Sequence, residues 1–140
     1  MTPKILLTVE SAIDEQLMLR ALRSHHIADE VIVVRNATEV LEWLAGRGAH
    51  VNRDASFEPR LLLIDLKLST AVATLAVIRT DARTKQIAVV IASYSNDEDE
   101  IATALKDGAT RYLYKSVDFT RFETAIGHLA TYWSTLKAAS

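Results

Sequence analysis

Short runs of apolar residues recur along the chain, and longer segments with apolar residues at helical spacing separate them. The run from Leu61 to Ile64 contains no polar residue, which is typical of a strand covered on both faces in a mostly parallel sheet. The other runs are shorter or mixed, and they recur at similar intervals. We therefore predict five strands, at Ile5–Val9, Val31–Val34, Leu61–Asp65, Val89–Ala92 and Arg111–Tyr114.

The first segment between strands predicts a helix from Ser11 to about Arg23. Ser11 and Asp14 have the spacing of a capping box, which marks the start of a helix. Ile13 and Leu17 lie one helical turn apart, so we expect both on the side that covers the sheet.

Asparagine residues that suit the N-cap position precede two further helices, at Asn36 and Asn96. These helices are expected to end at Gly46 and Gly108, and Gly108 supplies the left-handed C-terminal residue. Leu105 is expected to face inward. The remaining two helices are predicted at about Thr70–Arg79 and from Asp118 onward, where Phe122, Ile126, Leu129 and Trp133 repeat at helical spacing.

Five strand–helix repeats of similar length leave few architectures, because parallel strands need right-handed crossover connections. We predict an α/β fold, a flavodoxin-like, doubly wound five-stranded parallel sheet in the order 2-1-3-4-5. The polar, aperiodic segment Gly46–Pro59 is the longest predicted loop. The strand order reverses between strands one and three, which puts Glu10 beside Asp65 at the sheet edge where ligands bind in such folds.

Size and composition restrict the class of protein. The 140 residues, 49% of them hydrophobic, suit a single domain over residues 1–140. A net charge of -2 without a basic cluster argues against nucleic acid as a direct partner. The chain has no cysteine, which excludes thiol catalysis and thiolate metal sites. No apolar run has the length of a membrane span or a signal peptide, so we expect a cytoplasmic protein without membrane contact.

Polar side chains end four of the predicted strands, at Glu10, Asp65, Ser93 and Lys115. Two adjacent carboxylates resist joint ionisation unless a cation offsets them, which predicts a hard divalent ion such as Mg²⁺. Lys115 then suits a phosphoryl oxygen as a point charge, and the Ser93 hydroxyl suits another as a neutral donor. With its charge offset in this way, Asp65 is a candidate nucleophile that forms an acyl phosphate.

This set of residues resembles the receiver domains of two-component response regulators, and the resemblance covers almost the whole chain. It is strongest to the small, stand-alone phytochrome-associated response regulators. The segments that carry it are Lys4-Ile-Leu-Leu, Leu-Arg-Ala-Leu-Arg at 19–23, Pro59-Arg60 before Leu-Leu-Leu-Ile-Asp-Leu-Lys-Leu, Asp81-Ala-Arg-Thr-Lys and Val117-Asp118-Phe119.

The resemblance implies a phosphorelay signalling protein without an output domain. It implies no enzymatic activity beyond transfer of a phosphoryl group from a sensor histidine kinase to the protein's own aspartate. A homodimer through the fourth helix, the fifth strand and the fifth helix is implied as well.

The resemblance also gives each site residue a role. Asp65 matches the phosphoacceptor, Ser93 the family's serine or threonine, and Lys115 its lysine. Tyr112 matches the aromatic residue whose rotamer reports activation. The family's metal ligands correspond to Glu10, Asp65 and the backbone carbonyl of Lys67.

Several positions depart from the family pattern. Val9 replaces the first acid of the usual pair, and losing such a group costs about tenfold to a hundredfold in affinity or activity, so we expect weak Mg²⁺ binding. Ser69 and Ser116 each replace a proline. Tyr94 stands where a small residue normally leaves access to the acceptor. Together these changes predict weakened phosphoryl acceptance at Asp65.

Other interpretations stay open. Lys115 can pair with Asp65 without phosphate ever arriving, which would make the protein a pseudo-receiver, a phosphorylation-independent interaction and dimerisation module. Glu10 can belong to a helix start, where the macrodipole favours an acid, and Tyr112 can be a core aromatic residue. A flavin binder or phosphatase on this fold needs a glycine-rich loop or an Asp-x-Asp motif after the first strand, and residues 8–14 contain neither.

Overall fold

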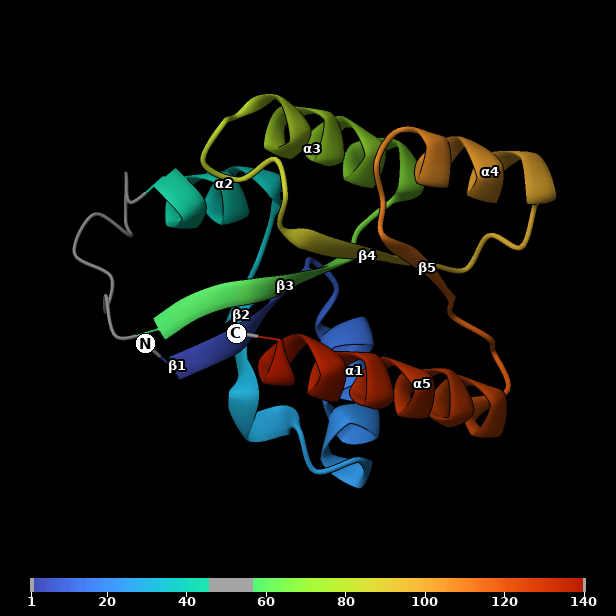
Figure 1. The fold of residues 1–140 in the computed structure, drawn as a ribbon. Coiled ribbons are helices and arrows are strands. Elements are labelled where there is room, and N and C mark those ends of the chain that lie inside the picture. Colours follow the sequence, from blue (N-terminus) through green and yellow to red (C-terminus); the bar gives the residue numbers. More distant parts are fainter. Residues whose placement is uncertain (1, 46–56, 140) are drawn as a thin grey trace.

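The computed structural model describes residues 2–45 and 57–139. Five parallel strands form one sheet in the order β2-β1-β3-β4-β5, so the predicted class and strand order are confirmed (Figure 1). The strands are β1 (Thr2–Val9), β2 (Val31–Val34), β3 (Phe57–Asp65), β4 (Ala88–Ser93) and β5 (Arg111–Tyr114). The helices are α1 (Ala12–Ser24), the short 3₁₀ helix η1 (Ala28–Glu30), α2 (Ala37–Ala45), α3 (Leu68–Thr80), α4 (Glu98–Lys106) and α5 (Phe119–Ala138).

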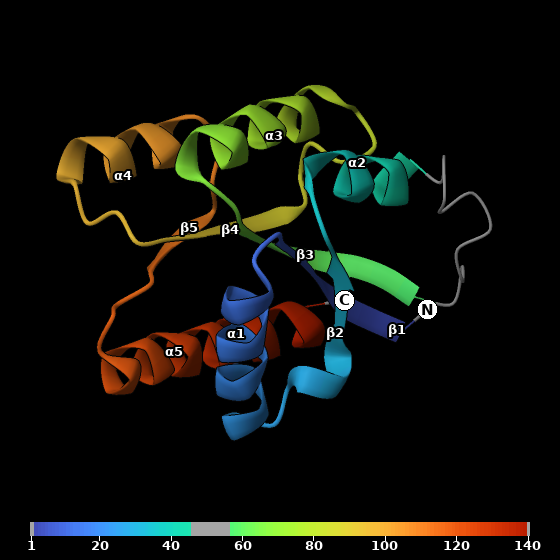
Figure 2. The same cartoon turned by 180° about the vertical axis from the view of Figure 1, so that it is seen from behind.

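Helices cover both faces of the sheet, with α2, α3 and α4 on one face and α1 and α5 on the other (Figures 1 and 2). Successive side chains of a strand point to opposite faces, so β1 buries Ile5 and Leu7 against α1 and α5 and Leu6 against α2 and α3. The central strand β3 divides its side chains in the same way, which explains its unbroken apolar run. Within the described residues, no helix combines the length and the apolar character needed to cross a bilayer.

Two predicted helix N-caps are confirmed. The side chain of Ser11 accepts a hydrogen bond from the backbone N–H of Asp14 at 3.2 Å, and Asn36 caps α2 in the same way. Asp118 caps α5. At the end of α4, Gly108 has φ of +117°, a backbone conformation that suits glycine because it has no Cβ.

Two predicted helix starts are wrong by one or two residues. The cap of α4 is Asp97 rather than Asn96, because the Asp97 side chain accepts the hydrogen bond from the backbone N–H of Glu100 at 3.0 Å. Aspartate and asparagine cap equally well, so the sequence alone does not choose between Asn96 and Asp97. The helix α3 begins at Leu68 rather than Thr70, so its first turn starts three residues after the end of β3.

Three other expectations are corrected. The predicted loop Gly46–Pro59 overlaps the start of β3, because Phe57 already pairs with β1; residues 46–56 lie outside the described residues. Ile13 is 72% exposed, because a row of residues four apart drifts around a helix by about 40° per step and leaves the buried face. Leu105 is 43% exposed and lies beside Ala104, which takes the buried position.

One carboxylate joins η1 to the end of α5. Glu30 accepts a hydrogen bond from the indole Nε1 of the buried Trp133, and its Oε2 lies 2.9 Å from Nζ of Lys137. Burial opposes ionisation of Glu30, but the bonds from Trp133 and Lys137 outweigh it and hold the pKa of Glu30 below its usual value.

The change Glu30→Ala is expected to lower the free energy of unfolding by about 1–3 kcal/mol, because the buried Trp133 N–H loses its acceptor. Since the pKa of Glu30 is lowered in the folded state, its contribution is present at neutral pH and fades as the pH falls below about 4. Urea unfolding followed by circular dichroism at several pH values measures both effects. Asp29→Ala, one residue away and exposed, is the matched control; an equal loss in both variants would contradict the assignment.

Candidate functional site

Four strand ends meet at the carboxyl edge of the sheet. Asp65 and Ser93 are the last residues of β3 and β4, while Glu10 and Lys115 directly follow β1 and β5. The four side chains line one cavity of about 380 Å³. The register pairs Val9 with Asp65, which sets the following Glu10 at the mouth of the same cavity. The structure therefore brings the sequence-predicted residues together.

Asp65 and Lys115 form a buried ion pair. Nζ of Lys115 donates a hydrogen bond to Oδ1 of Asp65 at 2.6 Å, and the two side chains are only 6% and 5% exposed. Oδ2 of Asp65 is buried and has no hydrogen-bond partner among the described residues. The carboxylate thus has one neutralised oxygen and one oxygen without a partner.

The environment of Asp65 raises its pKa above the usual value for a carboxyl group. Burial is the main cause, because a charged group loses hydration there. The nearby charge of Asp14 acts in the same direction, whereas the bond and the charge of Lys115 act against both. Asp65 therefore depends on Lys115 to carry a negative charge inside the protein.

Asp14 belongs to this site, and sequence reasoning missed it. Its Oδ2 lies 3.5 Å from Nζ of Lys115, and its Oδ1 accepts a hydrogen bond from the Tyr94 hydroxyl at 3.1 Å. The Tyr94 ring lies over the ammonium group of Lys115, 4.4 Å from Nζ to the ring centroid. Asp14 lies in the first turn of α1, the helix that starts directly after the Glu10 strand end, and this position was the signal that could have revealed it.

Asp14 also affects Tyr94. Burial raises the pKa of the Tyr94 phenol, and the Asp14 carboxylate raises it further by its charge and by accepting the phenolic hydrogen. The phenol therefore stays protonated and serves as a donor.

Ser93 and Tyr112 both contact the loop that follows β4. The Ser93 hydroxyl oxygen accepts a hydrogen bond from the backbone N–H of Ser95 at 3.1 Å. The Tyr112 hydroxyl donates to the backbone carbonyl of the same Ser95 at 2.7 Å. Ser93 lines the Asp65 cavity, whereas Tyr112 is half-buried and lines a different cavity beyond the loop.

The donor set suits a hydrated divalent cation. Glu10 is exposed, and the Lys67 carbonyl already accepts a hydrogen bond from the N–H of Ala71 at 2.9 Å, which leaves it one lone pair. In the described part of the chain, no three acidic or histidine side chains converge on one metal position. Mg²⁺ needs only one or two carboxylates with several waters, and the orphaned Oδ2 of Asp65 is a buried acceptor of that kind.

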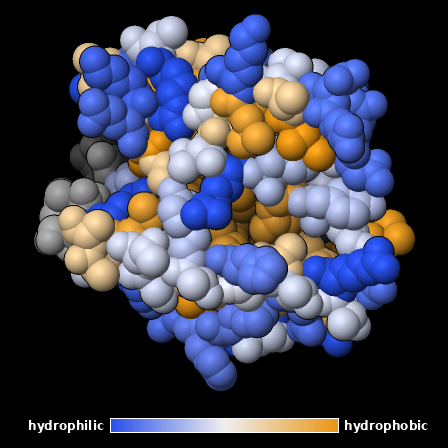
Figure 3. Space-filling view, turned by 45° about the vertical axis from the view of Figure 1, so that its right-hand side comes forward, coloured by the Kyte–Doolittle hydropathy of each residue, from blue (hydrophilic) through white to orange (hydrophobic). Residues whose placement is uncertain are grey.

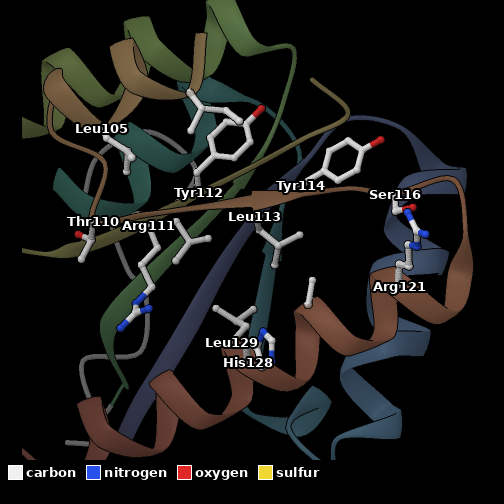
Figure 4. A pocket seen from close by; sticks show the side chains of 13 residues that line it. Leu105, Thr110, Arg111, Tyr112, Leu113, Tyr114, Ser116, Arg121, His128 and Leu129 are labelled. Atoms are coloured by element: carbon white, nitrogen blue, oxygen red, sulfur yellow. The ribbon is translucent and has the colours of Figure 1, made fainter. Parts of the chain in front are cut away.

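A second, apolar cavity of about 710 Å³ lies between α4, β5 and α5. Figure 3 shows hydrophobic residues in a hollow with polar residues around it. In Figure 4, Tyr112 and Tyr114 point to one side of β5, while Leu113 points to the other side, toward α5. Leu105 of α4 and Leu129 of α5 line the cavity from opposite sides.

Known proteins are similar to this chain in sequence and in fold, although no family model matches it. Response regulator Rcp1 of Synechocystis sp. is 28% identical over 134 residues, which cover 94% of this chain and 89% of Rcp1. The Mn²⁺-bound form of Rcp1 superposes with a TM-score of 0.77. The bacteriophytochrome response regulator RtBRR is 31% identical over 92% of this chain and 78% of its own, with a TM-score of 0.76. The phosphorylated cyanobacterial phytochrome response regulator RcpA is 27% identical over 94% of both chains, with a TM-score of 0.77.

A five-stranded sheet in this order, with an aspartate–lysine pair at its carboxyl edge, together with these similarities defines a receiver domain of two-component signalling. The chain belongs to the response regulator family, with phytochrome response regulators among its relatives.

The change Lys115→Met is expected to lower the free energy of unfolding at neutral pH by about 3 kcal/mol, because Asp65 is left buried without its counter-charge. The pKa of Asp65, already raised by burial, rises further in this variant, so the folded state takes up a proton as the pH falls and the loss becomes smaller. Urea unfolding at pH values between about 5 and 8 tests this dependence. Lys67→Met removes an exposed lysine from the same cavity and is the control. A loss that is independent of pH would count against the ion pair as its cause.

Proposed function

We propose that this receiver accepts a phosphoryl group on Asp65, at a rate lower than that of a receiver with an open acceptor site. The observation that carries the proposal is the Asp65–Lys115 pair at 2.6 Å beside a carboxylate oxygen without a partner. The Mn²⁺-bound form of Rcp1 and the phosphorylated form of RcpA support it, since both are relatives with the same fold.

The chemical step is an in-line phosphoryl transfer. An oxygen of Asp65 donates an electron pair to phosphorus, the new P–O bond forms, and the bond between phosphorus and the donor's leaving group breaks. The leaving group departs with the electrons of that bond. Lys115 pairs with a phosphoryl oxygen as the charge on Asp65 passes into the acyl phosphate. Ser93 is positioned to donate a hydrogen bond from the same cavity.

A divalent cation at the carboxyl edge would be held by Asp65, Glu10 and the Lys67 carbonyl, and it would offset the negative charge of the phosphoryl oxygens. The missing acid at Val9 supports weak binding of that cation. Val9 is completely buried in the α1 and α5 core, so it offers the edge no polar atom.

The alternative function is that of a pseudo-receiver. Lys115 and Asp14 already form a paired network around Asp65, and the Tyr94 ring covers Lys115. Such a network holds the edge together without phosphate, and this specific observation favours a module that acts through protein contacts alone.

Incubation of the protein with acetyl phosphate and Mg²⁺ is expected to add one phosphoryl group, measured by intact-protein mass spectrometry. Asp65→Asn keeps the shape of the side chain and removes the nucleophile, so this variant is expected to gain no mass. Chelation of the metal is expected to slow the wild-type reaction because the transferring charge is no longer offset. No mass gain in the wild type would remove phosphoryl acceptance and leave the pseudo-receiver.

We further propose a sensor histidine kinase as the donor and a homodimer through α4, β5 and α5. The apolar cavity between these elements supports an interface, since Leu105 and Tyr114 are 43% and 39% exposed there. Arg111 and Arg121 also line this cavity and give the face a basic border. A two-fold axis sets the same apolar residues of both copies against each other.

The change Leu105→Asp is expected to weaken the dimer by about 30-fold or more, because it puts a charge at the centre of the apolar contact. Analytical ultracentrifugation over a range of concentrations measures the dissociation constant. Val77→Asp introduces the same charge at an exposed position of α3, away from the proposed face, and is expected to leave the dimer intact. A wild type that stays monomeric at every concentration would refute the dimer.

A further inference from the structure

Asp14 is a charged residue at the site, and the phosphoryl transfer proposed above does not use it. We propose that Asp14 is a positioning residue that ties Lys115 and Tyr94 into a latch over Asp65, and that this latch limits the entry of the phosphoryl donor. The latch consists of Asp14, Tyr94 and Lys115. The inference rests on the proposed phosphoryl acceptance at Asp65.

The two oxygens of Asp14 serve different partners. Oδ2 faces the ammonium group of Lys115 at 3.5 Å, and Oδ1 accepts the Tyr94 hydroxyl hydrogen at 3.1 Å. The backbone N–H of Asp14 bonds to Ser11, while the carboxylate is directed to Lys115 and Tyr94. The spacing that suggested a capping box therefore gives only half of one, and the other half serves the site.

Lys115 is held from three directions. Asp65 contacts Nζ at 2.6 Å, Asp14 contacts it at 3.5 Å, and the Tyr94 ring lies over it at 4.4 Å. The latch thereby connects three segments that are distant in sequence: the first turn of α1, the residue after β4 and the residue after β5. A donor that reaches Asp65 needs Lys115 to exchange carboxylate oxygens for phosphoryl oxygens, and it needs the Tyr94 ring to move.

A cavity beside Tyr94 can accept its ring in another orientation. A cavity of about 250 Å³ on the side of α5 is lined by Tyr94 and Lys115 together with Leu17, Phe119 and Phe122. Its lining is mostly apolar, which suits an aromatic ring. Tyr94 is 49% exposed in the closed position, so the ring can turn without opening the core. The latch accordingly has a closed arrangement, described above, and space for an open one.

The variants that test the latch separate its two contacts. Asp14→Ala removes both, Asp14→Asn removes the charge but keeps an acceptor for Tyr94, and Tyr94→Phe keeps the ring but removes its hydroxyl. The double variant of Asp14→Ala and Tyr94→Phe tests coupling. Glu15→Gln is the control, because Glu15 lies on the same helix and pairs with Arg35 instead of the site.

The first measurement needs neither metal nor donor. Reductive methylation followed by peptide mass spectrometry gives the reaction rate of each lysine, and the exposed Lys106 is the internal reference. Asp14→Ala is expected to raise the rate at Lys115 by about threefold to tenfold, because a partly exposed ion pair and one hydrogen bond are lost. The double variant is expected to match Asp14→Ala, because the hydroxyl has no partner left once Asp14 is gone.

The second measurement compares two donors of different size, acetyl phosphate and phosphoramidate, with Mg²⁺. Asp14→Ala is expected to speed labelling of Asp65 by both, with a larger factor for acetyl phosphate, which needs the wider opening. A merely structural role for Asp14 would not change the ratio between the two donors. Glu15→Gln is expected to keep the wild-type rates.

The outcomes distinguish the latch from the proposed function. Labelling of Asp65 with no change in Lys115 methylation and no change in the donor ratio overturns the latch and keeps the function. Faster methylation of Lys115 without labelling of Asp65 in any variant supports the latch and overturns the function. Labelling in Asp14→Ala but not in the wild type supports a latch that keeps this receiver closed.

Discussion

The ion pair between Asp65 and Lys115 is the contact on which the carboxyl edge depends. A carboxylate buried this deeply loses its hydration, and a single ammonium group at 2.6 Å offsets part of that loss. Burial outweighs Lys115, since the pKa of Asp65 stays above its usual value. Lys115 has to be held where it neutralises Asp65, and two neighbours contact it there. Asp14 and the Tyr94 ring do so from the open side.

The sheet makes this meeting possible. Parallel strands with crossover helices bring all their carboxyl ends to one edge, and the order 2-1-3-4-5 places β1 and β3 side by side at the centre. The pairing of Val9 with Asp65 fixes the register of β1 against β3, so both strands end at the same level of the sheet edge. Because β1 and β3 are buried on both faces, a slip in register would bury the wrong set of side chains, so the packing that stabilises the fold also fixes the geometry of the site.

The sequence predicted what periodicity and strand ends determine. The strand order, the two confirmed helix N-caps and the meeting of Glu10, Asp65, Ser93 and Lys115 were all predicted in this way. The sequence did not predict which partner a side chain binds when it can bind either a nearby backbone group or a distant side chain. Asp14 fits a capping box by its spacing, but its carboxylate bonds to Tyr94 from another strand end, 80 residues away. The exposure of Ile13 and Leu105 has a similar cause. The apolar stripe of each helix is wider than the part that contacts the sheet, and tertiary packing selects which apolar residues are buried.

The same contacts support both a working receiver and a pseudo-receiver, and the difference between them is one of free energy. Phosphoryl transfer exchanges the bonds of Lys115 to Asp65 and Asp14 for bonds to phosphoryl oxygens. If the closed network is more stable than the open one by about 1.4 kcal/mol, the open population is about tenfold lower than it would be without that difference. The transfer rate falls by the same factor. Asp14 contributes a partly exposed ion pair and one hydrogen bond, which amount to about that much. A single carboxylate in the first turn of α1 can therefore decide whether this edge is a slow phosphoacceptor or a closed structural contact.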